Sequence, residues 1–469
     1  MRVFTAIVAI ACSPLCAADW PMFRGPNAAG VSDEKNLPVE FGKGKNMVWR
    51  TPLPPGHSSP VLAGDSIFLT AVEDERLFTI CLDRQTGRVK WRREAPRPRK
   101  EELHKSNNPA SPSAVSDGTN AYVFFTDFGL LAYGPDGNEL WRQPLGPFNN
   151  PMGMGASPVL AGDLLLLILD QESGSYFTAL DKKTGKERWR VDRSDYTRGF
   201  STPVLYQPDD GPLQAIIAGS YRLTSYEVAT GKPVWWVGGL TWQLKPTPVM
   251  ADGMIFVQGW AGGSDTGQQE FVEPFEDALK RLDKNGDGRI AKDEVTDPKM
   301  LKDWNSLDLD RDSALNERDW SLYRSRRQAQ NAIIGIKLGG KGDMTEKNTV
   351  WRYFKSLPNV PSPLWYDGVL YMLKEGGILT SFDPKTGDVL KQGRLTGALG
   401  LYFASPVGAD GKVYVVSEEG KAVVLKAGGE WEILAVNDLG EGAHATPAIA
   451  DGRMYLRTHQ ALYCFANAQ

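Results

Sequence analysis

The stretch ALDKKTGKERW, residues 179–189, carries the pattern that decides the fold. A short apolar strand ends at Asp181, and a Thr184-Gly185 turn leads into a strand that ends at Trp189. In such a turn an aspartate or threonine side chain caps the backbone, and glycine takes a positive φ. The turn and its tryptophan recur at Thr86-Gly87 before Trp91 and at Thr230-Gly231 before Trp235.

A Ser-Pro or Thr-Pro pair opens each repeat of this unit. Each opening leads into a short apolar strand, a tight turn and further strands, and four short strands every ~40–50 residues are typical of a propeller blade. The sequence therefore predicts an all-β protein, an eight-bladed β-propeller. The openings are Ser59-Pro60, Ser111-Pro112, Ser157-Pro158, Thr202-Pro203, Thr247-Pro248, Ser362-Pro363, Ser405-Pro406 and Thr446-Pro447.

The last repeat, from Thr446 to Gln469, has room for only three strands. Residues 47–50 precede the first opening and place Trp49 where the repeat has its terminal tryptophan. We expect this N-terminal strand to complete the last blade, which closes the ring and removes its exposed edges. Tryptophans that recur once per blade are expected to pack between blades: Trp49, Trp91, Trp141, Trp189, Trp235 and Trp351. The sixth and seventh repeats deviate, with Lys391 in the tryptophan's place and Trp431 out of register.

Residues 263–330 interrupt the fifth repeat, between propeller segments 19–262 and 331–469, with a charged, helical pattern. They contain two acidic loops of the length and spacing of an EF-hand calcium loop. In the first loop Gly288 permits the sharp turn. The Ca2+ ligands expected in this first loop are the side chains of Asp283, Asn285, Asp287 and Glu294 and the backbone carbonyl of Arg289.

The second loop fits this pattern less well. Ser313 replaces the turn glycine and must adopt a left-handed conformation, and Asp319 is shorter than the usual glutamate. We expect a weaker site, formed by the side chains of Asp308, Asp310, Asp312 and Asp319 and the backbone carbonyl of Ala314. An apolar stripe on a helix leads into each loop: Phe275, Leu279 and Leu282, then Met300, Trp304 and Leu307. Ile290 and Leu315 are placed to pair the loops, and calcium is expected to act as a structural clamp.

The first eighteen residues predict a secretory signal. Met1-Arg2 precedes an apolar run over residues 3–11, and small residues end at Ala18. The protein is therefore expected to be exported, to the periplasm or outside the cell; lipoprotein processing at Cys12 is the alternative. The apolar run is too short to span a bilayer, and no later segment predicts a transmembrane helix. A net charge of −4 without an evident basic face gives no reason to expect a nucleic-acid partner.

Cysteine and histidine are scarce, so their positions are informative. Cys81 and Cys464 occupy the same place in the repeat, where we expect small packing residues; a disulfide between neighbouring blades is the alternative. His57 and His444 each lie two residues before an opening hydroxyl residue, a place expected to line the mouth of the central channel. A solvated mouth is favoured over a ligand site. Comparable places are held by Asn108, Met154, Phe200, Lys245 and Phe403.

The repeats resemble the PQQ-like β-propeller repeat family, whose members carry the pattern Ala-Leu-Asp-x-x-Thr-Gly-x-x-x-Trp. The segment DWPMFRGP, residues 19–26, is also similar to the mature start of exported bacterial members. The family includes quinoprotein dehydrogenases and non-catalytic propellers such as the outer-membrane-assembly lipoprotein BamB, so the resemblance implies the fold and leaves the function open.

Three functions follow from these patterns. We favour a non-enzymatic, calcium-binding scaffold for an extracytoplasmic protein or polymer, and no catalytic residue is assigned. The first alternative is a calcium-dependent quinoprotein dehydrogenase that uses PQQ to oxidise alcohols or sugars. The sequence lacks the adjacent cysteine pair of the alcohol-oxidising members and any Cys-x-x-Cys-His haem motif. The second alternative is an outer-membrane protein assembly factor.

Overall fold

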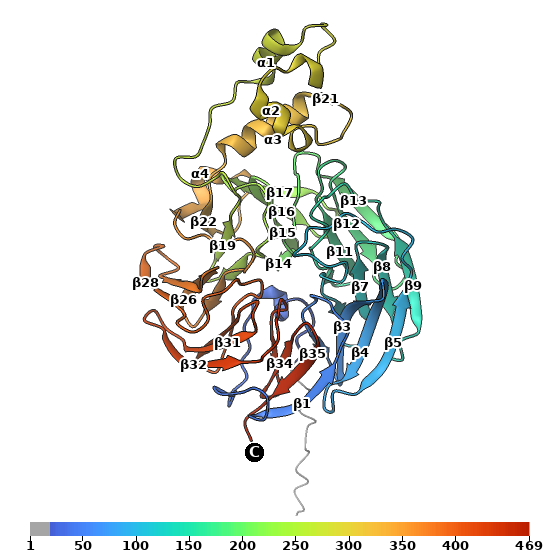
Figure 1. Cartoon of the computed structure of the whole chain (residues 1–469), viewed down its shortest axis with the longest axis vertical. Coiled ribbons are helices and arrows are strands. Elements are labelled where there is room, and N and C mark those ends of the chain that lie inside the picture. Colours follow the sequence, from blue (N-terminus) through green and yellow to red (C-terminus); the bar gives the residue numbers. More distant parts are fainter. Residues whose placement is uncertain (1–18, 469) are drawn as a thin grey trace, which may run out of the picture.

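The computed structural model describes residues 19–468; the predicted secretory signal, including Cys12, and Gln469 lie outside the described residues. Eight mainly antiparallel β-sheets of the described residues follow one another as blades around a central axis (Figure 1), and a ninth, two-stranded sheet lies outside the ring. This confirms the predicted eight-bladed propeller. Within residues 19–468, no helix has the length and apolar character needed to cross a membrane.

The first four blades follow the chain in order, each from its innermost to its outermost strand. Blade one contains β2 (Val61–Ala63), β3 (Ser66–Glu73), β4 (Arg76–Asp83) and β5 (Val89–Ala95). Blade two contains β6 (Val115–Ser116), β7 (Ala121–Phe125), β8 (Gly129–Tyr133) and β9 (Glu139–Pro144). Blade three contains β10 (Val159–Ala161), β11 (Leu164–Leu169), β12 (Tyr176–Asp181) and β13 (Glu187–Asp192). Blade four contains β14 (Val204–Tyr206), β15 (Gln214–Gly219), β16 (Arg222–Glu227) and β17 (Pro233–Gly238).

Blades five to seven continue this order, and blade five carries the insertion between its second and third strands. Blade five contains β18 (Val249–Ala251), β19 (Met254–Gly259), β22 (Ala332–Lys337) and β24 (Thr349–Tyr353). Blade six contains β25 (Leu364–Tyr366), β26 (Val369–Lys374), β27 (Ile378–Phe382) and β28 (Val389–Arg394). Blade seven contains β29 (Val407–Ala409), β30 (Lys412–Val416), β31 (Lys421–Lys426) and β32 (Glu432–Asp438).

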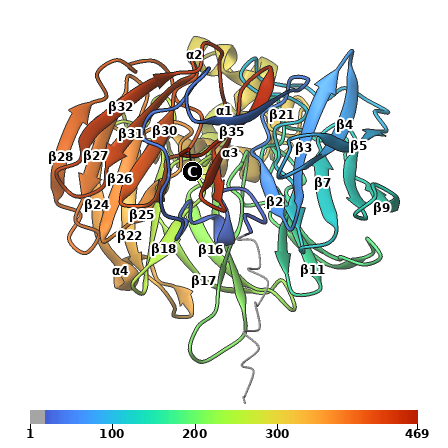
Figure 2. The ribbon, with the colours of Figure 1, turned by 90° about the horizontal axis from the view of Figure 1, so that it is seen from below.

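Blade eight joins the two ends of the chain. It contains β33 (Ala448–Ala450), β34 (Arg453–Arg457) and β35 (Ala461–Phe465), and its outer strand is β1 (Met47–Pro52). Trp49 lies opposite Cys464 in the antiparallel pair of β1 and β35. In Figure 2 the early blades and the late blades occupy opposite sides, with β35 between them. The predicted closure by an N-terminal strand is therefore confirmed.

The opening hydroxyl residues link neighbouring blades around the axis. At seven of the eight junctions the backbone N–H of one opening donates to the hydroxyl of the next, so the side chains that mark the repeat also position the innermost strands. In blade two this residue is Ser113, so the expected opening at Ser111 is wrong by two positions. The bonds run from Ser59 to Ser113 (2.9 Å), Ser113 to Ser157 (3.0 Å), Ser157 to Thr202 (3.1 Å), Thr247 to Ser362 (3.0 Å), Ser362 to Ser405 (3.0 Å), Ser405 to Thr446 (3.0 Å) and Thr446 to Ser59 (3.0 Å).

The recurrent tryptophans join the outer parts of neighbouring blades, as predicted. Trp91 donates its indole N–H to the carbonyl of Pro135 in the next blade (2.7 Å), and its ring faces Gly137, whose φ is 74°. The same indole bond joins Trp141 to Lys182 (2.8 Å), Trp189 to Val228 (3.0 Å) and Trp351 to Pro384 (2.9 Å).

Two positions depart from this pattern. Trp235 donates to Gln214 within its own blade, and β23 (Gly342–Asp343) pairs with β17 beside it. Lys391 donates to the carbonyl of Trp431 (2.6 Å), and its ammonium lies 4.5 Å from the centroid of that ring. In blade six a lysine, Lys391, stands in the tryptophan's place, and the aromatic residue, Trp431, lies in the turn of blade seven. A cation–π pair therefore provides the contact between these two blades.

Cys81 in β4 and Cys464 in β35 are free and fully buried. The predicted packing role is confirmed, and the alternative of a disulfide between neighbouring blades is wrong.

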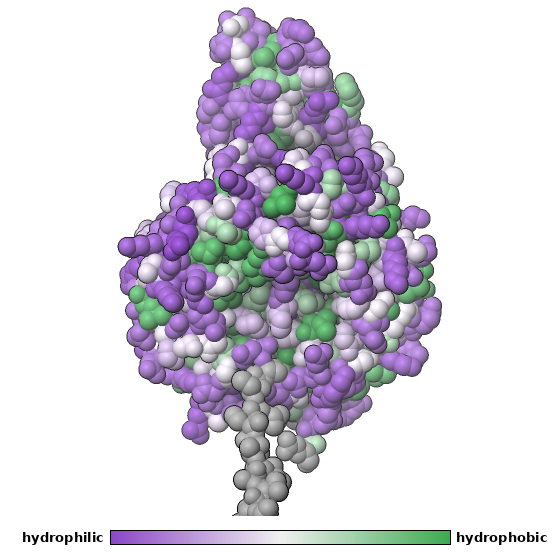
Figure 3. All heavy atoms as spheres, turned by 180° about the vertical axis from the view of Figure 1, so that it is seen from behind, coloured by the Kyte–Doolittle hydropathy of each residue, from purple (hydrophilic) through white to green (hydrophobic). Residues whose placement is uncertain are grey.

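The insertion leaves the ring after β19 and returns at β22. It contains helices α1 (Phe275–Leu282), α2 (Pro298–Lys302) and α3 (Glu317–Gln328), the 3₁₀ turns η2 (Lys292–Glu294) and η3 (Trp304–Ser306), and the paired strands β20 (Ile290–Ala291) and β21 (Ala314–Leu315). The remaining short elements are η1 (Pro26–Ala28) and α4 (Thr345–Asn348). Figure 1 shows the insertion projecting beyond the ring, and its surface is mainly hydrophilic in the view of Figure 3.

The insertion has a small apolar core of its own. Ile290 lies opposite Leu315, as predicted, in the antiparallel pair of β20 and β21 that joins the two acidic loops. The helix expected before the second loop is divided into α2 and η3, with Asp303 between them in a non-helical conformation. Both pieces still contribute to the core, which contains Val272, Ala278, Leu282, Ile290, Val295, Met300, Trp304, Leu307, Leu315 and Trp320.

Candidate functional site

The first acidic loop, residues 283–294, is closed by the carboxylates at its two ends. Asp283 accepts from the backbone N–H of Gly288 (2.9 Å), whose φ of 80° is the left-handed conformation expected there. Glu294 accepts from the backbone N–H groups of Ala291 (2.7 Å) and Lys284 (2.8 Å). These backbone bonds, first that from Ala291, lower the pKa of the Glu294 carboxyl, so it is ionised at neutral pH.

Side chains in the middle of this loop brace the turn. Asn285 Oδ1 accepts from the backbone N–H of Asp287 (2.8 Å), and Asp287 Oδ1 accepts from that of Arg289 (2.9 Å). The predicted donors of the first loop therefore lie on one tightly turned segment and retain oxygen atoms able to accept further bonds.

The second acidic loop, residues 308–319, concentrates negative charge. Asp308, Asp310 and Asp312 each have a carboxylate oxygen within 4.8 Å of the others. Asp308 is buried and accepts from the backbone N–H of Ser313 (2.9 Å). Ser313 has a φ of 74°, so it adopts the strained left-handed conformation predicted at the place of the usual glycine.

Asp319 connects the second loop to helix α3. It is 1% exposed and accepts from the backbone N–H groups of Leu309 (3.3 Å) and Asn316 (3.2 Å). The Asn316 side chain accepts from the backbone N–H of Asp319 (3.1 Å), so the two residues cap the helix reciprocally. Burial raises the pKa of Asp319 to about 6.

The side chain of Arg289 reaches from the first loop to the second. Its guanidinium forms an ion pair with Asp312 and donates to the carbonyl oxygen of Ala314 (3.2 Å), which are two of the predicted ligands of the second loop. The hydrogen bond from the Arg289 guanidinium to Asp312 lowers the pKa of the Asp312 carboxyl. The sequence indicated only a backbone role for Arg289, because the motif treats each loop separately.

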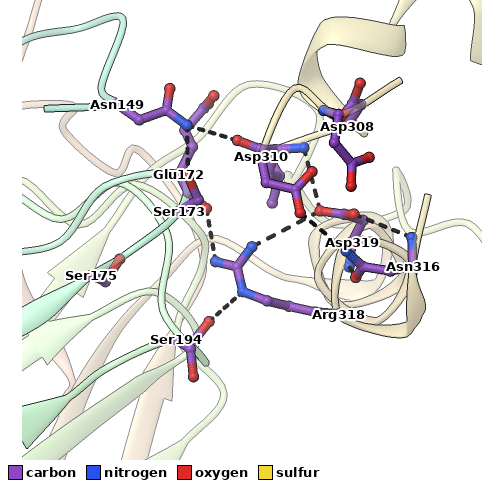
Figure 4. Close-up of polar contacts among 12 residues, drawn as sticks. Asn149, Glu172, Ser173, Ser175, Ser194, Asp308, Asp310, Asn316, Arg318 and Asp319 are labelled. Carbon is purple, nitrogen blue, oxygen red and sulfur yellow. Dashed lines mark hydrogen bonds and ion pairs between the residues drawn. The ribbon is translucent and has the colours of Figure 1, made fainter. Parts of the chain in front are cut away.

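The second loop is also the part of the insertion that contacts blades two and three (Figure 4). Asn149 Nδ2 donates to the carbonyl of Leu309, inside the loop (2.8 Å). Arg318, next to Asp319, donates from Nε to the carbonyl of Ser194 (2.8 Å) and from Nη2 to that of Glu172 (2.7 Å). Sequence patterns did not indicate these contacts, because the loop motif describes calcium ligands and does not say which ring residues face the loop.

Helix α3 extends this interface to blade four. Tyr221 donates its hydroxyl to the carbonyl of Leu322 (3.1 Å), and the Arg326 guanidinium lies 3.9 Å from the centroid of the Trp242 ring. The insertion is thus attached to the ring through its second loop and third helix as well as through its two ends.

Antiparallel order within the blades places several connections on one face of the ring. The connection from second to third strand and the connection to the next blade leave a sheet at the same end. The insertion joins a second strand to a third, and His57 and His444 precede the first strands β2 and β33. The acidic loops and these histidines therefore lie on the same face, which we call the insertion face.

Three of the four histidines meet at the channel mouth on this face. His57 stacks on His444 with ring centroids 4.1 Å apart and an interplanar angle of 1°, and His444 Nδ1 lies 2.7 Å from His459 Nε2. Burial, then the charges of His444 and Arg457, lowers the pKa of His57 to about 3, and burial followed by His459 lowers the pKa of His444 to about 4. Both rings are therefore neutral at pH 7.

Other expected mouth residues divide into two groups. Phe403 stacks on His444 at 4.4 Å, and the Lys245 ammonium lies 5.9 Å from the Phe200 ring centroid, so these residues contact one another in pairs. Met154 is instead buried in the core, and Asn108 caps its own turn by accepting from the backbone N–H of Ala110 (2.8 Å). The sequence did not indicate His459, because it lies between β34 and β35 rather than before an opening.

The fold and the insertion define a class: a closed eight-bladed propeller with an acidic two-loop insertion on one face. The sequence matches the family described as outer membrane protein assembly factor BamB over residues 31–173 and 172–468, and the chain belongs to that family. No curated protein has a significant match to the sequence.

Solved structures of two kinds share the fold. BamB from Moraxella catarrhalis has 13% identity and a TM-score of 0.56, over 90% of this chain and 98% of that chain. Quinohemoprotein alcohol dehydrogenase ADHIIG from Pseudomonas putida HK5 has 12% identity and a TM-score of 0.58, over 96% of this chain and 81% of that chain. The quinohemoprotein alcohol dehydrogenase from Comamonas testosteroni has 13% identity and a TM-score of 0.54, over the same shares. Identities this low establish the fold alone.

Proposed function

We propose that this protein is an exported, non-enzymatic propeller scaffold whose insertion is a pair of EF-hands that calcium clamps onto the ring. The observation that carries the proposal is that the second acidic loop is also the contact with blades two and three, through Asn149 and Arg318. A change in the order of that loop therefore reaches the ring directly.

The residues of both loops fit calcium. Ca2+ takes six to eight oxygen ligands from carboxylates, amides and backbone carbonyls. The first loop supplies Asp283, Asn285, Asp287, Glu294 and the Arg289 carbonyl, and Gly288 already has the required conformation. The second loop supplies Asp308, Asp310, Asp312, Asp319 and the Ala314 carbonyl. Mutual repulsion among its clustered carboxylates favours a cation between them.

A clamp fits the energetics better than a signalling switch. Extracellular calcium modules bind at ~10⁻⁴–10⁻³ M, and at millimolar calcium a site of ~10⁻⁴ M stabilises the fold by about 1.4 kcal/mol. That amount shifts the equilibrium between an open and an ordered second loop about tenfold, and so favours the contacts that Leu309 and Arg318 make with the ring. It is small against the closed ring, so we expect the propeller itself to stay folded without calcium.

Limited proteolysis tests this proposal. Calcium should protect residues 263–330 from cleavage in the natural protein, whereas a Glu294→Gln/Asp308→Asn variant should be cut equally with calcium and with chelator. Glu276→Gln, on the exposed surface of α1, is the matched control and should behave as the natural protein does. If residues 263–330 of the natural protein resist protease equally with calcium and with chelator, the proposal that calcium clamps the insertion is wrong.

Family membership favours a role in outer-membrane protein assembly as the second candidate for the scaffold. An exported location, periplasmic or secreted, is proposed from the pattern of residues 1–18. In-cell crosslinking from the insertion face, followed by identification of the attached proteins, tests both points. Recovery of outer-membrane assembly components supports this role, and recovery of cytoplasmic proteins alone argues against export.

The dehydrogenase alternative is disfavoured by where the mature chain's cysteines lie. Cys81 and Cys464 are buried in β4 and β35, so they cannot form an adjacent pair over a quinone. Titration of the calcium-loaded protein with PQQ, followed by tryptophan fluorescence, decides the matter. Saturable one-to-one binding would overturn the non-enzymatic proposal and direct work to a dye-linked assay with alcohols and sugars.

A further inference from the structure

Ring closure brings three histidines from the two ends of the chain together at the channel mouth. His57 comes from blade one, and His444 and His459 come from blade eight. One ring nitrogen from each residue lies within 4.8 Å of the other two. All three rings are half-buried, while the fourth histidine, His104, is exposed and lies outside the group.

The ring nitrogens have polar neighbours, one of them within the group and two outside it. His444 presents Nδ1 to His459 Nε2 at 2.7 Å, and its Nε2 lies 3.8 Å from Glu418 Oε1. His57 Nδ1 lies 3.5 Å from Ser111 Oγ. Histidines that bind metals characteristically direct the second ring nitrogen to a carboxylate or another acceptor, which fixes the tautomer and the ring orientation.

The backbone beside His459 leaves room for its ring in this orientation. A Cβ added to Gly442 would lie 2.8 Å from His459 Cε1 and 2.9 Å from Nδ1. The backbone N–H of His459 also donates to the Gly442 carbonyl (2.8 Å). Residue 442 is thus a glycine where any larger residue would displace the imidazole.

We propose that His57, His444 and His459 bind one divalent transition-metal ion of the zinc class at the channel mouth. Three imidazole nitrogens are a common protein ligand set for Zn2+ and leave a fourth position for water or another ligand. Calcium prefers oxygen ligands, so this site is chemically distinct from the acidic loops. The metal would link blades one and eight at the place where the ring closes.

Calorimetric titration of the full mature chain with ZnCl2, in excess calcium to occupy the acidic loops, tests the proposal. We expect one Zn2+ per chain. Affinity should fall at least ~100-fold in His459→Ala and in His57→Gln, and about 10–100-fold in Glu418→Gln, a positioning residue. His104→Ala is the matched control and should bind as the natural protein does. Far-ultraviolet circular dichroism without metal establishes that each variant is folded.

Titration with Co2+ supplies a second readout. Tetrahedral coordination by imidazoles should give visible d–d absorption that zinc abolishes and that is missing in His459→Ala. Failure of the natural protein to bind zinc one-to-one would overturn the proposal. So would zinc binding that persists in folded His57→Gln and His459→Ala, or that His104→Ala weakens equally.

Discussion

The indole ring of Trp49 packs directly on the backbone of Gly87: a Cβ placed on Gly87 would lie 2.5 Å from Trp49 Cε3. Trp49 belongs to β1 in blade eight, and Gly87 belongs to the Thr-Gly turn of blade one, so this contact joins the first and last blades. Gly87 has a φ of 72°. One glycine thus meets two requirements, a left-handed turn and room for the neighbouring indole.

Replacement of this glycine should weaken ring closure. Gly87→Ala should lower the free energy of unfolding by about 2–5 kcal/mol, because a left-handed backbone and an overpacked indole each add a cost. Gly64→Ala is the matched control. Gly64 also has a positive φ, 54°, but no atom lies within 4 Å of an added Cβ, so its loss should be only about 1–2 kcal/mol. Urea denaturation measures both values, and equal losses would contradict the packing role of Trp49.

The ring could be predicted from sequence because its contacts are local and repeated. The Thr-Gly turn and the tryptophan are both visible in residues 179–189, and most blades repeat this turn and its tryptophan. The register of blade two was mispredicted because Ser111-Pro112-Ser113 offers two serines around one proline. Only the hydrogen bonds to neighbouring openings distinguish Ser113 as the equivalent residue.

The insertion should separate from the ring when Arg318 is lost. Arg318→Gln removes the donors to the Ser194 and Glu172 carbonyls, so residues 263–330 should be cut faster by protease even with calcium present. Calcium affinity should change by no more than about fivefold, because Arg318 is not a ligand and its ion pair with the Asp319 ligand is long (3.9 Å). Arg324→Gln is the control, since Arg324 makes a comparable bond to the Val272 carbonyl (3.0 Å) within the insertion. Equal cleavage of both variants would show that Arg318 does not anchor the insertion.

Arg289 should compete with calcium for the second loop. Arg289→Gln keeps the backbone carbonyl for the first loop but removes the cation that pairs with Asp312. We expect the affinity of the second loop to rise roughly two- to fivefold, the effect of an ion pair of about 0.4–1 kcal/mol near the surface. Arg281→Gln, which removes a charge that pairs with Glu273 outside the loops, should leave the affinity unchanged. Calcium calorimetry checks this, and a lower affinity in Arg289→Gln would refute the competition.

The buried thiols should resist modification. Burial raises the pKa of Cys81 to about 11 and that of Cys464 to about 12. With a pKa of about 11, only about one thiol in a thousand is ionised at pH 8, and the thiolate is the reactive form. A chromogenic disulfide reagent at pH 8 should detect no thiol in the folded protein prepared without residues 1–18, and two after denaturation in urea. Detection of none after denaturation would point to a disulfide.

The same shifts set an alkaline limit to stability. Both thiols have a folded pKa above the unfolded value of about 8.5. Below that pH their contribution to the free energy of unfolding is therefore fully present. It is lost as pH rises from about 8.5 toward 11–12, because the unfolded chain ionises first. Cys81→Ala, which removes one titrating group, should flatten this loss in urea denaturation.

The parts of the site that sequence did not indicate are those made by residues far apart in the chain. The acidic loops follow a compact motif, so their expected ligands could be named. The side-chain role of Arg289 depends on how two loops face each other, and Asn149 contacts Leu309 across 160 positions. His459 approaches His57 only because the last blade closes on the first. Such proximities follow from the curvature of the whole ring, which no local pattern encodes.

The pairing of β1 with β35 also imposes an order in time. β1 is among the first strands to leave the ribosome and β35 is the last, so blade eight cannot form until synthesis is nearly complete. Joining strands so distant in sequence is slow, because the intervening chain must first be ordered. Until then β1 has no partner strand, and the apolar faces of blades one and eight do not cover each other, so association with other chains can begin there. The period of greatest aggregation risk therefore ends only when the C-terminal strand reaches its partner.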